Sequence, residues 1–421
     1  SLQFPQISTN AQTMKTILFA PETINIAEVT RMIEIAKTCR DKFNCEFFGY
    51  GGDYAHLIEE AGFPLHLLEP RVTPKRADEL FKADRMEAGG KFFTNAEMIT
   101  RATNEISLYK KLNPAAIVIG FTLSTLVSAP AARIPLVYVM PFALTRPFFE
   151  ANPQIWSKLF GHTPLRWLPA RWLNTTLNRI FLNAKLWIKP VNAARARFGV
   201  PPVKRMVDLF EGDHNLVTEI PELAGVNTLP QNWHFVGPIF ARLDGDVPPE
   251  IERLPRDKPL LYFAMGSSAN RDVLLKVTEM FRGLPYTVVA PIRAHLPADY
   301  QPPENVHVFG WLPAHKLNPL ADLAVIHGGQ GTVQTACWSG TPFVGIGLQP
   351  EQEFNVYAVE QFGCAIGLKK NGVTRERLHA AIEQLLADKN ARARANVLQQ
   401  KMRAKDGAVE VGRFLEERFG S

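Results

Sequence analysis

The chain has few cysteines, and none of them is arranged like a metal or redox site. Its 421 residues contain four, Cys39, Cys45, Cys337 and Cys364, with no Cys-x-x-Cys pair among them. This scarcity argues against a disulfide-rich secreted scaffold and against a zinc module. We therefore expect a reduced, cytoplasmic setting.

A long uninterrupted apolar run is also missing. The longest apolar region, residues 115–144, is broken by Pro130, Arg133 and Pro135, so it does not have the pattern of a membrane span. Residues 1–13 carry no charge and no apolar stretch, which does not fit a secretory signal. We interpret them as a leader or an expression remnant.

What the chain does contain is typical of a globular enzyme, with 46% hydrophobic and 21% charged residues. A length of 421 residues exceeds the usual size of one core, so we expect two domains. Short apolar runs alternate with longer helical patterns, which is typical of βαβ units in parallel sheets. The main predicted strands are residues 16–20, 45–50, 115–119 and 135–140, and then 260–264, 287–290, 306–309, 323–326 and 343–346.

The predicted organisation is two Rossmann-like halves. An N-terminal domain would span residues 14–240, and a C-terminal domain would span residues 258–395. A stretch rich in Pro, Gly and Asp at residues 241–257 has the composition of a linker. Residues 396–421 continue a charged, periodic helical pattern.

The most informative motif is a glycine-rich turn at residues 327–332, His-Gly-Gly-Gln-Gly-Thr, directly after the predicted strand 323–326. Glycines allow a tight turn, and a helix starting there would direct free N–H groups and its positive dipole end at an anion. His327 and Thr332 add a ring donor and a hydroxyl donor. Alone, the turn is also consistent with a simple strand-to-helix connection.

A second glycine turn, Met265-Gly266-Ser267-Ser268, follows the predicted strand 260–264. Its serines carry hydroxyl and backbone donors that suit a phosphate or a sugar. A polar loop without a ligand is the alternative.

The neighbours of these turns are more specific than the turns themselves. Gly310-Trp311-Leu312-Pro313 lies upstream, and Gly340-Thr341-Pro342 and Pro350-Glu351-Gln352-Glu353-Phe354-Asn355 lie downstream. Their order and spacing resemble the donor-binding signature of family 1 nucleotide-sugar glycosyltransferases, which include UDP-glycosyltransferases and bacterial antibiotic and macrolide glycosyltransferases. The resemblance implies an α/β GT-B fold with two domains facing a central cleft, and a C-terminal helix, residues 396–421, that crosses back to the N-terminal domain.

The resemblance also implies site residues. Trp311 would stack on the nucleobase, with a core tryptophan as the alternative. Glu351 and Gln352 would bind hydroxyls of the donor sugar, and Asn355 belongs to the same signature. The diphosphate would be held by His327, Gly328, Gly329, Gln330, Gly331 and Thr332, together with Gly266, Ser267 and Ser268. The implied donor is a UDP or dTDP sugar, with no other cofactor and no metal.

Three departures put plain UDP-glucose in doubt as the donor. Glu351 replaces an aspartate of the family, Ala314 replaces a glutamine that reads the base edge, and Thr335 replaces a glutamate that grips the ribose.

The family's catalytic His–Asp pair is absent. When the first helix is aligned, Glu28 takes the histidine position and Gly120 takes the aspartate position. A carboxylate is a competent base, and burial can raise its pKa toward neutrality, so our hypothesis is that Glu28 deprotonates the acceptor. Alternatively, Glu28 only favours the helix dipole, or Glu22 or Asn25 on the same loop acts instead.

Residues 151–206 contain ten basic residues, no acidic residue and four of the seven tryptophans. Indoles beside cations suit an anionic lipid surface. We therefore favour a lipophilic, membrane-resident acceptor and peripheral contact with the inner face of a membrane. A lid over a soluble acceptor and an oligomer interface are alternatives, and nucleic acid is not expected because no recognisable module is present.

The sequence thus predicts a metal-independent, hexosyltransferase-like inverting glycosyltransferase acting on a lipophilic acceptor. The missing dyad leaves a catalytically silent GT-B nucleotide-binding or regulatory protein as an alternative. A GT-B sugar-nucleotide epimerase fits less well, because Trp311, Gln352 and Asn355 belong to the transferase pattern.

Overall fold

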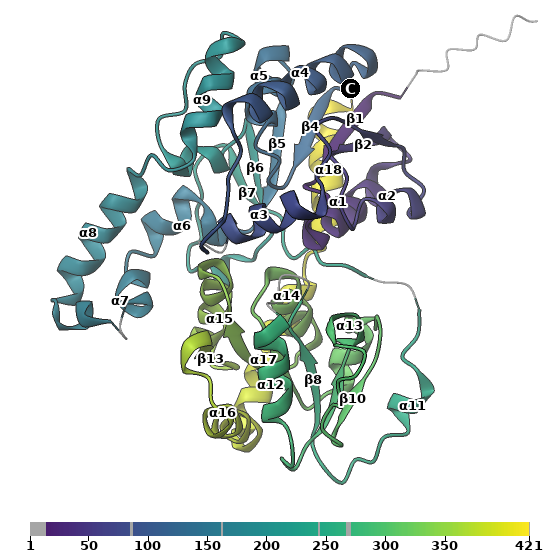
Figure 1. The fold of residues 1–421 in the computed structure, drawn as a ribbon, viewed down its shortest axis with the longest axis vertical. Coiled ribbons are helices and arrows are strands. Elements are labelled where there is room, and N and C mark those ends of the chain that lie inside the picture. Colours follow the sequence, from purple (N-terminus) through teal and green to yellow (C-terminus); the bar gives the residue numbers. More distant parts are fainter. Residues whose placement is uncertain (1–13, 85–86, 161–162, 243–244, 267–270, 421) are drawn as a thin grey trace, which may run out of the picture.

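The computed structural model describes residues 14–84, 87–160, 163–242, 245–266 and 271–420. It contains two α/β domains, one above the other in Figure 1, each built around one parallel sheet. The predicted α/β class with two parallel sheets is therefore confirmed. The predicted leader, residues 1–13, lies outside the described residues, as do Ser267 and Ser268.

The N-terminal sheet has seven strands in the order β3-β2-β1-β4-β5-β6-β7. They are β1 Thr16–Ala20, β2 Asn44–Gly49, β3 Leu65–Leu67, β4 Ala116–Ile119, β5 Leu136–Met140, β6 His214–Val217 and β7 Trp233–Phe235. The helices of this half are α1 Ile26–Cys39, α2 His56–Glu60, α3 Pro74–Asp84, α4 Asn95–Leu112, α5 Thr125–Ala132, α6 Arg146–Ala151, α7 Ile155–Leu159, α8 Ala170–Leu182, α9 Ile188–Arg197 and α10 Pro221–Ala224. The strand order reverses between β1 and β4, so their following loops diverge and leave room for a ligand there.

The C-terminal sheet has six strands in the order β10-β9-β8-β11-β12-β13. They are β8 Leu260–Ala264, β9 Thr287–Ala290, β10 Val306–Val308, β11 Leu323–Ile326, β12 Phe343–Gly347 and β13 Ala365–Lys369. The helices are α11 Pro249–Glu252, α12 Arg271–Met280, α13 Ala314–Leu317, α14 Gln330–Ser339, α15 Pro350–Phe362, α16 Arg375–Ala387, α17 Lys389–Arg403 and α18 Gly407–Phe419. Here the order reverses between β8 and β11, the two strands followed by the glycine turns.

Both sheets are buried on their two faces, which is why their strands are continuous apolar runs rather than alternating ones. All residues of β8 and β11 are buried, and those of β1 are buried except for the partly exposed Thr16. The sheets therefore act as rigid platforms whose carboxyl-terminal loops carry the site.

The last helix returns to the N-terminal domain. Val411 and Leu415 of α18 are fully buried and join the same apolar cluster as Val29 of α1. The hydroxyl of Thr38 on α1 donates to the carbonyl of Ala408 at 3.1 Å. The predicted boundary at residue 396 falls inside α17, so the chain crosses back after α17 rather than at that position.

None of the helices in the described ranges is both long enough and apolar enough to cross a membrane.

Candidate functional site

The two glycine turns of the C-terminal domain meet around the ring of His327. His327 follows β11 and Gly266 follows the adjacent β8. A Cβ atom at Gly266 would lie 2.4 Å from Cε1 of His327, and one at Gly329 would lie 2.4 Å from Nε2. A side chain at either position would displace the ring, so Gly266 and Gly329 leave the space that the imidazole occupies.

The enclosed imidazole is neutral. His327 is 6% exposed, and burial lowers its pKa to about 4, while a hydrogen bond with the carbonyl of Ala264 opposes this shift. Among the described residues its Nδ1 has no hydrogen-bond partner. A buried polar atom without a partner is costly. A bound anion would favour the charged imidazolium form of the ring, in which Nδ1 also carries a proton to donate.

Helix α14 begins directly at the turn and leaves its first amides free of side-chain caps. Its N-cap is Gly329, which has no side chain to accept the first-turn N–H groups. These N–H groups are therefore available to an anion. Gly328 has φ of +83°, and a Cβ there would lie 2.7 Å from the carbonyl oxygen of Gln352. The hydroxyl of Thr332 donates to the carbonyl of Gly329 at 2.8 Å.

Helix α15 packs beside the turn and supplies the other predicted donor residues. Nδ2 of Asn355 donates to the carbonyl of Gly328 at 3.1 Å and to Oε1 of Glu351 at 2.6 Å. Gln352 is buried, and its Oε1 accepts the N–H of Leu348 at 2.9 Å. The structure thus places Glu351 and Asn355 at the turn, whereas the side-chain oxygen of Gln352 is occupied by backbone.

Trp311 and Thr335 are two further positions that the sequence assigned to the predicted donor site. Trp311, which follows β10, is 60% exposed, so its indole is available to a planar ligand rather than buried in the core. The hydroxyl of Thr335 donates to the carbonyl of Gly331 at 2.7 Å and is thus used within α14.

On the predicted acceptor side, the carboxyl group of Glu28 lies in the space beside Gly120, where any other residue would have a side chain. Oε2 of Glu28 accepts the N–H of Glu22 at 3.1 Å and the N–H of Phe121 at 3.0 Å. A Cβ at Gly120 would lie 2.7 Å from the same oxygen. Since Glu22 follows β1 and Gly120 follows β4, the carboxyl group lies where the strand order of this sheet reverses.

Burial raises the pKa of Glu28 from 4.5 to about 7. The charge of Glu22 acts in the same direction, whereas the hydrogen bonds from the N–H groups of Glu22 and Phe121 and the charge of Arg31 oppose it. A carboxyl group with a pKa near neutrality suits proton transfer at physiological pH.

The other two predicted bases on this loop are engaged elsewhere. Oε1 of Glu22 accepts from Nη1 of Arg101 at 2.8 Å. The side chain of Asn25 caps α1 by accepting the N–H of Ala27 at 2.9 Å. Their contacts favour Glu28 over both.

Arg31 and Thr218 are functional candidates that sequence reasoning missed. Nη2 of Arg31 and Oγ1 of Thr218 both donate to Oε1 of Gln330, at 2.9 and 3.0 Å. Gln330 therefore uses its side chain to join the domains, which leaves its backbone N–H for the predicted diphosphate. The one signal for Arg31 was a charge in the otherwise apolar part of α1, three residues after Glu28.

Arg31 introduces a buried positive charge between the two halves of the site. It is 5% exposed, and burial lowers its pKa, while the charges of Glu28 and Glu351 oppose that effect. One of these carboxylates belongs to each domain. The position of Arg31 between them links the predicted base to the predicted sugar-binding residue.

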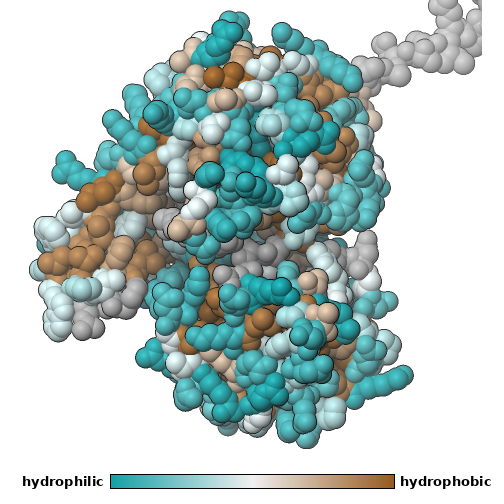
Figure 2. All heavy atoms as spheres, viewed as in Figure 1, coloured by the Kyte–Doolittle hydropathy of each residue, from teal (hydrophilic) through white to brown (hydrophobic). Residues whose placement is uncertain are grey.

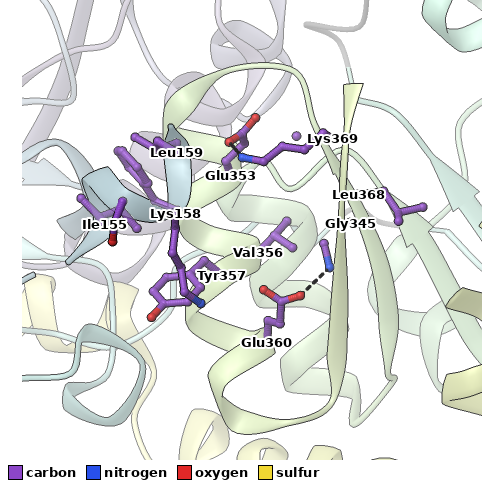
Figure 3. Close-up of a pocket in the computed structure, with 14 residues that line it drawn as sticks. Ile155, Lys158, Leu159, Gly345, Glu353, Val356, Tyr357, Glu360, Leu368 and Lys369 are labelled. Atoms are coloured by element: carbon purple, nitrogen blue, oxygen red, sulfur yellow. Dashed lines mark hydrogen bonds and ion pairs between the residues drawn. The ribbon is translucent and has the colours of Figure 1, made fainter. Parts of the chain in front are cut away.

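A separate cavity of about 290 Å³ lies where α7 meets the C-terminal domain (Figure 3). Nζ of Lys158 on α7 lies 3.5 Å from the ring centroid of Tyr357 on α15. Tyr357 and Glu360 line this cavity from a different side of α15 than the one that carries Glu351 and Asn355. The cavity is therefore distinct from the glycine turns.

The chain is similar to known proteins in sequence and in fold. Residues 286–418 match the family described as erythromycin biosynthesis protein CIII-like, C-terminal domain. A PGL/p-HBAD biosynthesis rhamnosyltransferase of Mycobacterium bovis (strain BCG / Pasteur 1173P2) is 27% identical over 379 residues, which cover 88% of this chain and 80% of the relative.

Solved structures share the whole fold. The glycotransferase of kitacinnamycin superposes with a TM-score of 0.68 at 20% identity, covering 97% of this chain and 99% of that one. The glycosyltransferase VinC in complex with dTDP gives a TM-score of 0.65 at 16% identity, covering 96% and 99%. The expected GT-B fold is confirmed.

Proposed function

We propose that this protein is a family 1 nucleotide-sugar glycosyltransferase. It transfers a sugar with inversion from a UDP or dTDP sugar to a lipophilic acceptor, with Glu28 as the base. The observation that carries the proposal is the contact between Glu28 and Gly120, because a buried carboxyl group with a pKa of about 7 stands where the family keeps its catalytic dyad. The lipophilic acceptor is supported by the basic and tryptophan-rich segment 151–206. The relative that acts in PGL/p-HBAD biosynthesis is consistent with it.

The proposed reaction is a single displacement. Glu28 takes the proton of the acceptor hydroxyl while that oxygen bonds to the anomeric carbon of the sugar. The bond from this carbon to the diphosphate oxygen breaks on the opposite face, which inverts the configuration. The leaving diphosphate gains negative charge, which the first-turn amides of α14 and the ring of His327 would stabilise.

We assign the remaining donor contacts by their positions around this cradle. Trp311 would stack on the base, and Glu351 would accept hydroxyls of the sugar, held in place by Asn355. Gln352, whose Nε2 also donates to Oε1 of Gln349 at 3.4 Å, would contact the sugar through its amide group. We propose that the transfer needs no metal, because amides and ring donors line the place proposed for the diphosphate.

Product analysis tests the function directly. Incubation with UDP and dTDP sugars and a panel of lipophilic hydroxyl compounds should yield a glycosylated acceptor and one equivalent of free nucleoside diphosphate. Release of epimerised donor would indicate an epimerase. Nucleotide binding without any product across the panel would indicate a silent nucleotide-binding protein.

His327→Ala is expected to weaken nucleoside diphosphate binding by about tenfold, because it removes a contact to the diphosphate worth about 1.4 kcal/mol. Isothermal calorimetry with UDP and dTDP measures this. Undiminished affinity would refute the diphosphate role of His327. His327→Gln, which keeps an amide donor in the same space, should lose less, and thermal unfolding of both variants separates affinity from folding.

A further inference from the structure

Helix α8 projects from the N-terminal domain and is fixed to it by one face (Figure 1). Leu173 on that face is 3% exposed. Asn178 accepts a hydrogen bond from Nε1 of Trp156 at 3.0 Å and donates one to the carbonyl of Phe149, also at 3.0 Å. The orientation of α8 is therefore set by α6 and α7, and its other face points outward.

The outward surface is apolar where solvent would favour polar side chains. Of the eleven large apolar side chains that are exposed in the described ranges, five lie between residues 167 and 186. They are Trp167 at 79%, Leu168 at 37%, Trp172 at 55%, Ile180 at 61% and Leu186 at 59% exposure. Figure 2 shows apolar surface gathered on the projecting part that α7 and α8 form.

The same surface is positively charged. Arg171, Arg179, Lys185 and Lys189 are exposed. None of these four forms an ion pair with a carboxylate within the described part of the chain, and residues 151–206 contain no acidic residue. We call these four cations and the five apolar side chains the outer α8 surface. Its charge is complementary to anionic lipid headgroups, and its indoles suit the boundary between headgroups and acyl chains.

The outer α8 surface belongs to a segment that also reaches the C-terminal domain. The segment that carries it begins after β5, and its helix α7 lines the cavity against α15 (Figure 3). A lid for a soluble acceptor would bury its apolar side chains against the site, whereas these five are 37% to 79% exposed. A bilayer in contact with this surface would therefore lie against a segment that connects the two domains.

We propose that the outer α8 surface docks on an anionic membrane and that the acceptor is a hydroxyl-bearing lipid delivered from that membrane. The acceptor part of this inference rests on the transferase function proposed above, whereas the docking part does not. Docking is peripheral, with Trp172 and Ile180 entering the interface and Arg171, Arg179 and Lys185 contacting headgroups.

Co-sedimentation with vesicles tests the docking. The wild type should sediment with vesicles of phosphatidylcholine and phosphatidylserine, and much less with phosphatidylcholine alone. The triple variant R171Q/R179Q/K185Q should partition about a hundredfold more weakly, since each cation near an anionic surface contributes about fivefold. W172A/I180A should also bind more weakly, at equal charge.

A matched control removes three exposed cations from the other domain, in K258Q/K276Q/K389Q, and should bind vesicles like the wild type. Equal binding of the wild type to neutral and anionic vesicles, or an unaffected triple variant, would overturn the proposal. The proposal would also be overturned if the wild type formed a dimer that W172A/I180A dissociates and neither the wild type nor this variant bound vesicles.

Nucleotide affinity and transfer to a detergent-dispersed acceptor should be unchanged in the triple variant, whose substitutions lie outside the cleft. Loss of transfer to vesicle-embedded acceptor alone supports delivery from the membrane. Charge-dependent vesicle binding without transfer to any acceptor would refute the transferase proposal and leave the docking standing.

Discussion

Glu28→Gln is expected to lower turnover by about 10²- to 10⁴-fold, the usual contribution of a general base. The amide fills the same space and its oxygen still accepts the N–H groups of Glu22 and Phe121, but it cannot take a proton. Donor affinity should be unchanged, because the predicted diphosphate cradle belongs to the other domain. Steady-state kinetics with the acceptor found by the screen, and calorimetry with the nucleotide, measure the two effects.

The pH dependence of wild-type turnover should reflect the titration of Glu28. The base form of Glu28 is required, so turnover should rise as the pH passes through about 7 and level off above it. Glu28→Gln should lack this rise. Asn25→Ala is the matched control: it removes the α1 cap, at a cost of about 1 kcal/mol of stability, but leaves the carboxyl group and the pH profile in place.

The thermal stability of Glu28→Gln shows whether its turnover falls because the base is lost or because the protein unfolds. The pKa of Glu28 is higher in the folded protein than its ordinary value of 4.5, so the folded state binds this proton more tightly. Glu28 therefore reduces stability as the pH rises from about 4.5 through about 7. Glu28→Gln removes that loss and should unfold at an equal or higher temperature at pH 8. Turnover of Glu28→Gln near that of the wild type would refute the assignment of Glu28 as the base.

The sequence predicted those parts of the fold in which local pattern and tertiary environment agree. Strands β8, β9 and β11 have the predicted bounds because a strand buried on both faces must be a continuous apolar run. The predicted boundary at residue 396 lies inside α17 because the charged, periodic pattern continues from α17 into α18. The crossing point is visible only from the packing of α18 on α1.

The site was predictable in its motifs but not in its contacts. The glycine turn indicated an anion cradle, yet the side chain of Gln330 bonds Arg31, which is 299 residues away in the chain. No spacing rule links such positions. Likewise, the sequence showed only that Gly120 replaces the aspartate of the family. The structure shows that the absence of a side chain at Gly120 leaves space for the carboxyl group of Glu28.

Gly120→Asp is expected to destabilise the protein by about 3 kcal/mol or more, because it buries a second carboxyl group against the first. Its Cβ alone would lie 2.7 Å from Oε2 of Glu28 and 2.9 Å from Cδ, so Glu28 must also move. Chemical denaturation measures the loss. Gly120→Ala, which adds the steric conflict without the charge, should cost less and separates the two causes.

Adding Glu28→His to Gly120→Asp restores the pairing found in the family, a histidine beside an aspartate. The imidazole can donate to the new carboxylate, so stability should recover relative to Gly120→Asp alone, and the two substitutions should show a favourable coupling energy in a double-mutant cycle. Turnover should recover partly over both single variants, because the restored histidine is again a base near neutral pH. Additive effects would mean that residues 28 and 120 do not act on each other. In that case the carboxylate at residue 28 could not be regarded as the replacement for the lost dyad.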